Sequence, residues 1–331
     1  MSRRRGLPTA VRVMVWLVCL PLLAAGAGAA VLSAWPALQR TGPLALAASF
    51  APLGAVCAVA AAVLLLVLVV LGRPRRLAGA GLLLSLALVV PPVAPAVPPL
   101  LAGPQPVGEH RLTVVSLNML SGQADPESIA RAAAGADVLV LVEVLPDALE
   151  AVLATDVGTD FPHRGGAAQD GYSGTLVLSR HPVETVEVLD LSFQQRLVRL
   201  DVPGIGPVHL LAAHPINPLA GTGIWEREHR QLLELATGVG RGPVVVAGDL
   251  NAVDQHVVMQ AWRQAGFTDV AHSAGAGWVR TWPADRRFPP VIGIDHVLTG
   301  PGLTGVELST FWVPGTDHLG LRAVLAPTTT D

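Results

Sequence analysis

The stretch Pro243-Val244-Val245-Val246-Ala247-Gly248-Asp249-Leu250-Asn251 decides the fold class of the second half of this chain. It begins with an apolar, mostly β-branched run, which is typical of a short strand buried on both faces. The carboxylate of Asp249 and the amide of Asn251 follow at once, and such groups need partners if they are buried. An Asx turn would explain an isolated Asp-Leu-Asn, so the rest of the sequence must decide between a turn and a site.

Short apolar runs of the same kind recur through residues 111–331 and predict further strands. Helices are expected between some of them at Pro126–Ala134, Ile224–Gly238 and Gln255–Ala265, with Asp125 as the N-cap of the first. This pattern predicts an α/β (α+β) domain in which two packed β-sheets carry helices on their outer faces. The other expected strands are 111–117, 137–142, 174–178, 197–202, 208–213, 294–298 and 321–325.

Polar side chains end several of these strands. Each has an ordinary explanation when taken alone: Glu143 as a strand-edge charge, Asn118 as a helix cap, an Asp-His pair as part of a solvated loop. All of these explanations would have to hold at once, which is less probable than one shared site. Carboxylates, amides and imidazoles at the ends of several strands suit a hard cation and a phosphate. The positions are Asn118, Glu143, His214 with Asn217, Asp249 with Asn251, Asp295, and Asp317 with His318.

The composition of the whole chain indicates a membrane protein. Of its 331 residues, 51% are hydrophobic and 14% charged, and the mean hydropathy is +0.51, which is too apolar for an ordinary soluble protein. Residues 1–108 hold eight Arg and no acidic residue, whereas the remainder holds 14 Arg against 25 acidic residues, a net charge of −11. All 22 basic residues are Arg, which excludes mechanisms that need a catalytic Lys. Intrinsic disorder and disulfide-framework classes are excluded too.

Residues 1–102 are expected to form a membrane anchor with three transmembrane helices, at about 11–34, 44–71 and 77–97. A cleavable signal peptide is the alternative for the first block. In the third block, prolines from Pro91 onward predict that the helix ends near Val90 and continues as a polyproline-like exit. A half-inserted segment is the alternative there.

The positive-inside rule places the amino terminus and the Arg-rich loop 73–76 in the cytoplasm. The chain beyond the third helix, with a linker at 103–110 and a domain at 111–331, is then extracytoplasmic. A cleaved first block would leave that outcome unchanged. Cys19 and Cys57 lie in apolar blocks and are expected to act as small hydrophobic residues.

The ordered motifs resemble the endonuclease/exonuclease/phosphatase superfamily over residues 111–325. The three-helix start is similar to a membrane-anchored actinobacterial branch that includes the teicoplanin-resistance protein VanJ. The resemblance implies a four-layer α/β sandwich with two mixed sheets and metal-dependent hydrolysis of a phosphoester. Val142 and Thr316 depart from the family pattern, where Gln and Ser are usual. The motifs are Ser116-Leu117-Asn118, Glu143, Leu178-Ser179-Arg180, His214, Gly248-Asp249-Leu250-Asn251, Ile294-Asp295-His296-Val297 and Thr316-Asp317-His318.

A divalent metal is implied by the resemblance, with Glu143 as its principal ligand and Asn118 and Asp317 beside it. Mg²⁺ is the expected ion, and Mn²⁺ or another divalent cation is the alternative. The residue types agree, because Mg²⁺ favours carboxylate and amide oxygens and the domain has no Cys for zinc. The sequence leaves open whether one or two metals bind.

The resemblance also implies the catalytic residues. Asp249 would orient or deprotonate the attacking water, and Asn251 would donate to the phosphoryl oxygens. His318, oriented by Asp295, would contact the phosphate, and His214 would bind phosphate or aid the leaving group from the other side. A carboxylate beside an imidazole favours the imidazolium, which keeps the ring a donor near neutral pH.

Other histidines and tryptophans are weaker candidates. His296 should face away from its neighbour Asp295 by the period-two rule, which predicts a packing role. Trp278, Trp282 and Trp312 could line a substrate cleft, lie at a membrane interface or pack in the core. The remaining histidines, expected on the surface or in structural roles, are His110, His163, His181, His209, His229, His256 and His272.

The sequence therefore predicts a membrane-anchored, metal-dependent phosphoester hydrolase that acts on an extracytoplasmic phosphate, phosphodiester or pyrophosphate. Its expected partners are the lipid bilayer and a phosphorylated small-molecule or lipid-linked substrate. An anchored extracellular nuclease is the alternative, less favoured because a domain with a charge of −11 lacks the broad basic surface that nucleic acid requires. An inactive binding or sensing protein is the third hypothesis. No protein partner is inferable.

Overall fold

The computed structural model describes residues 7–71, 75–97, 107–240 and 242–329. The chain divides into two compact units, residues 1–98 with 254–257 and residues 99–253 with 258–331. Part of the expected linker at 103–110, and Arg73 and Pro74 of the loop between the second and third apolar blocks, lie outside the described residues.

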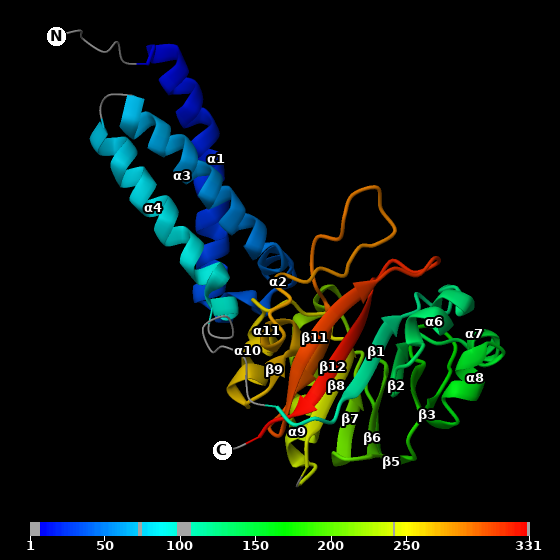
Figure 1. The fold of residues 1–331 in the computed structure, drawn as a ribbon. Helices are drawn as coiled ribbons and strands as arrows, with labels where there is room; N and C mark the ends of the chain where they lie inside the picture. The colour runs from blue at the N-terminus through cyan, green and yellow to red at the C-terminus, as the bar shows by residue number, and fades with distance from the viewer. Residues whose placement is uncertain (1–6, 72–74, 98–106, 241, 330–331) are drawn as a thin grey trace. The chain divides into compact units, whose positions relative to one another are not determined.

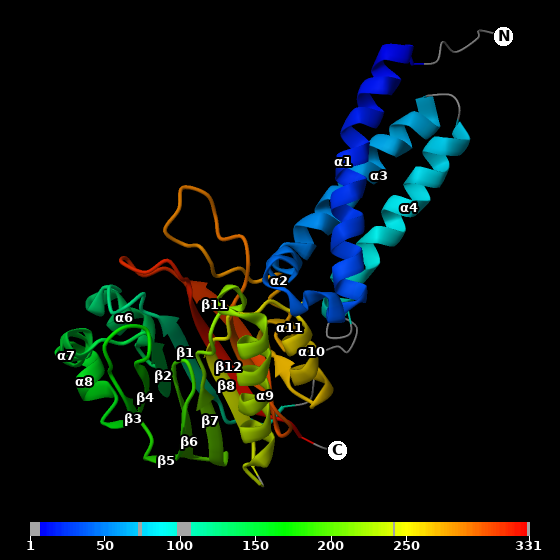
Figure 2. The same cartoon turned by 180° about the vertical axis from the view of Figure 1, so that it is seen from behind.

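The first unit holds three helices that are long and apolar enough to cross a membrane, α1 (Thr9–Ala34), α3 (Ala51–Leu71) and α4 (Arg75–Val93). Figures 1 and 2 show them side by side. Small residues allow α1 and α3 to approach closely, because a Cβ added at Gly54 would lie 2.2 Å from Cβ of Ala29. These helices support membrane association of the chain.

Two details of this unit differ from the sequence prediction. The second apolar block is interrupted at Phe50, so that a short helix α2 (Gly42–Ser49) precedes α3, and a 3₁₀ turn η1 (Pro36–Arg40) lies before it. The third helix continues through two prolines to Val93, three residues past the expected end, and a 3₁₀ turn η2 (Ala94–Ala96) follows. Proline's fixed φ suits a helix, but each of these prolines lacks the N–H that would donate to the carbonyl four residues earlier. Because both stand in the last turn, only the final helical bonds are lost.

The second unit contains two six-stranded mixed β-sheets packed face to face, which confirms the predicted fold class. Their order is β11-β12-β1-β2-β4-β3 and β5-β6-β7-β8-β10-β9. Valine, leucine and alanine side chains from both sheets fill the space between them. The strands are β1 (Leu112–Asn118), β2 (Val138–Val142), β3 (His163–Ala167), β4 (Thr175–Ser179), β5 (Val183–Asp190), β6 (Gln194–Val202), β7 (Gly206–Ala212), β8 (Val244–Asp249), β9 (Thr268–Asp269), β10 (Asp295–Thr299), β11 (Leu303–Phe311) and β12 (Gly320–Pro327).

Helices cover the outer face of each sheet, so the unit has four layers. Figures 1 and 2 show α6 to α8 beside the sheet that contains β1, and α9 and α10 beside the other. The short helix α11 packs against β11, and its Val270 lies in the core between the sheets. The carboxylate of Asp125 accepts from the N–H of Ser128, which confirms the expected N-cap of α6. The helices are α6 (Pro126–Ala133), α7 (Pro146–Leu153), α8 (Asp156–Asp160), η3 (Pro218–Ala220), α9 (Thr222–Gly238), α10 (Val257–Gln264) and α11 (Val270–Ser273).

Strand register brings the ends of the central strands together. The parallel strands β1 and β2 pair Asn118 with Val142, so both chains leave the sheet at one level. In the second sheet the antiparallel strands β8 and β10 pair Asp249 directly with Asp295. The hydroxyl of Thr316 donates to the carbonyl of Asn118 (2.7 Å), which fixes the turn before β12 at the same end.

Candidate active site

The first part of the site lies where β1 and β2 end. Asn118 Nδ2 donates to Glu143 Oε1 (2.9 Å), and the backbone N–H of Ser121 donates to Glu143 Oε2 (2.9 Å). Glu143 is buried and has φ of +58°. This conformation costs a residue other than glycine about 1–3 kcal/mol, and it persists where the surrounding structure holds it. The backbone therefore turns this carboxylate toward Asn118.

Asp249, at the end of β8, joins that pair to the second sheet. Its Oδ2 accepts from Asn118 Nδ2 (3.1 Å), and its Oδ1 accepts from the backbone N–H of Asn251 (2.8 Å). The amide of Asn118 thus bridges two carboxylates, which follow it by 25 and 131 positions along the chain. Asn251 has φ of +47°, and its side-chain Nδ2 donates to the carbonyl of Pro215 (3.0 Å).

His318 lies among three carboxylates. Its Nδ1 is 2.9 Å from Asp295 Oδ2, and its Nε2 is 3.8 Å from Asp249 Oδ2 and 3.7 Å from Asp317 Oδ1. Burial is the largest influence on the pKa of His318 and acts to lower it, but the carboxylates, Asp295 first, outweigh burial and raise the pKa to about 10. His318 is therefore an imidazolium at neutral pH, suited to donate to an anion.

His214 has the opposite protonation state. Its Nε2 is 3.7 Å from Glu143 Oε1 and 3.8 Å from Asp249 Oδ2. Burial lowers the pKa of His214 below its ordinary value, and the charge of Asp249 opposes that effect only in part. The two histidines thus differ in charge near neutral pH, which separates a cationic donor from a neutral ring within one site.

The neutral ring of His214 is held by two neighbours on or beside β6. Phe193 stacks on it with ring centroids 4.6 Å apart. Gln195 fixes the backbone of His214 with two hydrogen bonds. Gln195 Nε2 donates to the carbonyl of His214 (2.8 Å), and Gln195 Oε1 accepts from the N–H of His214 (2.6 Å). The sequence analysis did not identify either residue, since both stand at the amino end of β6 and not where a strand runs out into a polar motif.

Burial also changes the carboxylates. It raises the pKa of Glu143, although hydrogen bonds from Asn118 and Ser121 oppose it. It raises the pKa of Asp249 as well, and the charge of Asp295 adds to that increase. A buried carboxylate with a raised pKa must hold a proton or lie against a cation.

The residues present fit a divalent metal at the Glu143 side of the site. Glu143 supplies a carboxylate, and Asp317 has a buried Oδ1 that accepts no hydrogen bond from the described residues. Asn118 turns its Nδ2 toward Glu143, and its amide oxygen accepts from the N–H of Leu120 (2.9 Å), so it would ligate a metal only after its side chain reorients. The other oxygen of Asp317, Oδ2, accepts from Trp282 Nε1 (2.8 Å), which orients the carboxylate. These donors match the oxygen preference of Mg²⁺.

Asp249, Asp295 and His318 form a second group whose donor atoms lie within 4.8 Å of one another. A metal would need a lone pair on His318, but the ring carries both protons at neutral pH because its pKa is about 10. This group therefore suits a proton and an anion better than a metal. Glu143 is not a member of this group.

A buried histidine holds the backbone before Asn251. His229 on α9 has Nε2 2.9 Å from the carbonyl of Leu250, and Trp262 Nε1 donates to His229 Nδ1 (3.3 Å). These two contacts require the neutral ring with its proton on Nε2. His229 was expected in a surface or structural role, and the structure shows the structural one.

A second buried histidine holds the backbone after Asn251. His296 Nε2 is 2.8 Å from the carbonyl of Ala252, and its Nδ1 pairs with the carboxylate of Asp269. This confirms that His296 points away from Asp295. The carbonyls on both sides of Asn251 are thus fixed by imidazoles from α9 and β10.

The structure brings all eight sequence-predicted site residues to one end of the two sheets, and the contacts above link seven of them directly. Asn251 joins them through its backbone N–H rather than its side chain. Of the three tryptophans considered, Trp282 contacts the site through Asp317, whereas Trp278 and Trp312 are exposed by 46% and 61%.

Comparison with known proteins agrees with this geometry. The sequence model of the Endonuclease/Exonuclease/phosphatase family matches residues 115–318. The protein YbhP of Escherichia coli (strain K12) is 28% identical over 190 residues, which cover 52% of this chain and 70% of YbhP.

Solved structures share the fold. An endonuclease/exonuclease/phosphatase from Beutenbergia cavernae DSM 12333 has a TM-score of 0.52 and 22% identity, covering 66% of this chain and 72% of that one. TDP2 of D. rerio, complexed with single strand DNA product, has a TM-score of 0.53 and 18% identity, covering 66% of this chain and 99% of that one. At these identities the likeness shows the fold alone.

Proposed function

This chain belongs to the endonuclease/exonuclease/phosphatase family, and from that premise we propose that it is a membrane-anchored, Mg²⁺-dependent phosphoester hydrolase whose catalytic domain acts outside the cytoplasmic membrane. The observation that carries the proposal is the convergence of Glu143, Asp249 and His318 at one end of two sheets. The three apolar helices and their arginine distribution support the membrane anchor and its orientation.

The residues divide the work of hydrolysis among themselves. Asp249 accepts the proton of the attacking water, and its raised pKa makes it a stronger base once ionised. His318 donates to the phosphoryl oxygens as an imidazolium, and the hydrogen bond to Asp295 fixes its orientation. A metal held by Glu143, Asn118 and Asp317 would supply charge neutralisation on the phosphate.

The neutral His214 faces the same carboxylates from the segment that follows β7 and is placed to donate one N–H to the phosphate or the leaving oxygen. Asn251 holds the loop after β8 against Pro215, which keeps Asp249 aligned. Positioning and charge stabilisation suffice for phosphoryl transfer, so no covalent intermediate is required.

The proposed substrate is a lipid-linked or envelope phosphate, phosphodiester or pyrophosphate, since an anchored enzyme meets membrane substrates at high effective concentration. The arrangement of three helices before the domain supports placement in the membrane-anchored branch that includes VanJ.

A substrate panel tests the proposal. The purified full chain in detergent is given undecaprenyl pyrophosphate, its monophosphate, a sphingomyelin-like lipid and plasmid DNA, each with Mg²⁺ and with chelator. We expect Mg²⁺-dependent release of phosphate from undecaprenyl pyrophosphate or its monophosphate, or of the phosphorylated headgroup from the sphingomyelin-like lipid, and no release by the His318→Ala variant. Cleavage of DNA without lipid turnover would establish the nuclease instead, and no turnover of any substrate would favour a binding protein.

Sidedness needs a separate test. After Cys19 and Cys57 are replaced by alanine, a single cysteine at the exposed position Glu187 is treated with an impermeant maleimide on intact cells. Labelling before lysis supports extracytoplasmic action, and labelling only after lysis contradicts it.

A further inference from the structure

Segment 275–291, which joins α11 to β10, carries a charge opposite to that of the domain around it. It has three arginines and one aspartate, a net charge of +2, whereas residues 109–331 together carry −11. The rest of the domain therefore carries −13. The charged residues of the segment, all exposed, are Arg280, Asp285, Arg286 and Arg287.

The same segment exposes two large aromatic side chains. Trp278 is 46% exposed and Phe288 is 53% exposed. The guanidinium carbon of Arg280 lies 5.0 Å from the centre of the Trp278 ring, so a cation and an aromatic face are presented together. Arg286 pairs with its sequence neighbour Asp285 (3.1 Å), an exposed contact that contributes little and leaves the guanidinium accessible.

The base of the segment is fixed although its tip is exposed. The N–H groups of Thr281 and Trp282 donate to the carbonyl of Ile292 (2.8 and 2.9 Å), and the N–H of Ile292 donates back to Trp282 (3.1 Å). Figures 1 and 2 show the segment as an orange loop that extends beyond the strand ends of the catalytic unit. Trp282 also donates to Asp317, so the base of the loop contacts the candidate active site.

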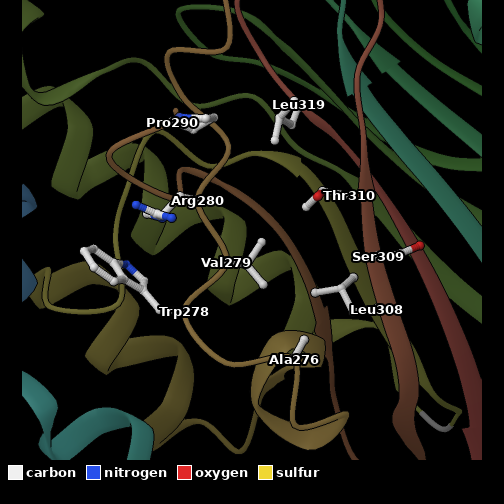
Figure 3. A pocket seen from close by; sticks show the side chains of 9 residues that line it. All are labelled: Ala276, Trp278, Val279, Arg280, Pro290, Leu308, Ser309, Thr310 and Leu319. Carbon is white, nitrogen blue, oxygen red and sulfur yellow. The ribbon is translucent and has the colours of Figure 1, made fainter. Parts of the chain in front are cut away.

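A cavity of about 410 Å³ lies between this loop and the edge strand β11. Figure 3 shows Trp278 and Arg280 on the loop side, and Leu308 and Thr310 on the strand side. The volume is within the range of ligand pockets, about 300–1,000 Å³. Its walls combine apolar side chains with the guanidinium of Arg280 and the hydroxyls of Ser309 and Thr310, donors that suit a phosphate group.

From these observations we propose that segment 275–291 docks on an anionic phospholipid bilayer, with Trp278 and Phe288 in the interfacial region and Arg280, Arg286 and Arg287 against lipid phosphates. Tryptophan is favoured at the membrane interface, and arginines are attracted to an anionic leaflet. The surrounding charge of −13 is repelled by the same leaflet, so electrostatics turns this loop toward the lipid.

The chain itself supplies the reason for choosing a bilayer as partner. Three helices can cross a membrane, and only 14 residues, 98–111, separate Val97 from Leu112. Such a length spans at most about 50 Å when fully extended, while a domain of this size has a radius of gyration of about 17 Å. The linker thus keeps the whole domain within reach of lipid phosphates. Nucleic acid would need a broader basic surface than a local charge of +2.

Fluorescence in vesicles tests the proposal without relying on catalysis. In the full chain with Cys19 and Cys57 replaced by alanine, Phe288→Cys is labelled with an environment-sensitive dye and reconstituted into vesicles that contain doxyl-labelled lipid. We expect quenching in equimolar phosphatidylglycerol and phosphatidylcholine, and weaker quenching in phosphatidylcholine alone. The matched control is Val188→Cys on β5, also apolar and 41% exposed, where no quenching is expected.

A charge variant checks the cause. Replacing both Arg286→Gln and Arg287→Gln should weaken the association of the loop with the phosphatidylglycerol surface by roughly 30-fold, as measured by the loss of quenching. Each arginine contributes about a factor of five to binding near an anionic surface. Hydrolysis of bis(p-nitrophenyl) phosphate should stay unchanged, which separates this result from failure of the active site.

Two outcomes would overturn the proposal. One is equal quenching at positions 288 and 188 in anionic vesicles. The other is a dye at position 288 that responds to added duplex DNA but not to phosphatidylglycerol, which would assign the loop to nucleic acid.

Discussion

Replacing Asp295 by Asn should lower the pKa of His318 while leaving the shape of the site intact. In the unsubstituted protein the carboxylates raise the pKa of this ring from 6.5 to about 10 against the opposing effect of burial. That difference corresponds to about 5 kcal/mol of preference for the imidazolium. Asp295 is the foremost contributor and lies 2.9 Å from Nδ1. An opposite charge at this distance shifts a pKa by roughly 1–3 units.

The stabilisation of the folded state follows the same shift. Because the folded-state pKa of His318 is above the unfolded value, its contribution is fully present below pH 6.5 and is lost as the pH rises through about 10. In Asp295→Asn the loss should occur at lower pH, by the same roughly 1–3 units. Stability near neutral pH should fall by about 1.4–4 kcal/mol.

NMR titration of the metal-free full chain, labelled at histidine ¹³Cε1 and held in detergent with chelator, measures this directly. The His318 resonance is identified by its absence in His318→Gln. Asp269→Asn is the matched control, since Asp269 pairs with the other buried histidine, His296, and should leave His318 unchanged. The reasoning is refuted if His318 titrates near its ordinary pKa in the unsubstituted protein, or keeps a pKa of about 10 without Asp295.

Four further outcomes are expected. Glu143→Gln should lower kcat of the Mg²⁺-dependent reaction by at least ~10²-fold. It should also remove the thermal stabilisation by Mg²⁺, which for the unsubstituted chain is about 2.7 kcal/mol when Mg²⁺ is at 100 times its Kd. Residual stabilisation by Mg²⁺ in this variant would contradict the ligand role of Glu143. Mg²⁺ binding should release protons, because burial raises the pKa of Glu143 and Asp249, as calorimetry in buffers of different ionisation enthalpy would detect. Gly248→Ala should destabilise the domain by at least ~3 kcal/mol, because Gly248 has φ of +146° and the new Cβ would lie 2.0 Å from the carbonyl oxygen of Ala213. Gly223→Ala is the control, since its Cβ would have nothing within 4 Å. Denaturant unfolding of both variants measures the difference. His229→Phe should lower kcat roughly tenfold with little change in KM, because it frees the backbone beside Asn251; an equal loss in KM would point to a binding defect.

The central strands could be predicted from sequence because burial on both faces leaves a continuous apolar run, as in 138–142 and 244–247. The edge strands β3, β5 and β11 could not, since their outer faces are exposed and their residues alternate or include glycine. An edge strand lacks the continuous apolar run that burial on both faces gives the inner strands.

The candidate site was predictable to the same extent. Asn118 and Asp249 directly end buried strands, a position where a polar side chain needs a partner, and that requirement can be seen in the sequence. The positive φ of Glu143 and the hydrogen bonds between Gln195 and the backbone of His214 cannot be predicted from the sequence, because both arise from contacts between distant segments. Likewise, the difference in charge between the cationic His318 and the neutral His214 depends on which carboxylate lies nearest, a matter of register and not of composition.

Charge balance in the site determines the order in which ligands can bind. Glu143, Asp249, Asp295 and Asp317 surround one cation, His318. If all four carboxylates ionise, the buried cluster has three excess negative charges, a state that burial disfavours and that the raised pKa values of Glu143 and Asp249 reflect. Without a dication, every carboxylate of the cluster that ionises beyond the one balanced by His318 repels an anionic phosphate. Phosphate affinity should therefore depend on prior metal binding, so that inorganic phosphate protects the chain against thermal unfolding only when Mg²⁺ is present. Protection by phosphate in the presence of chelator would show instead that His318 alone supplies the anion site.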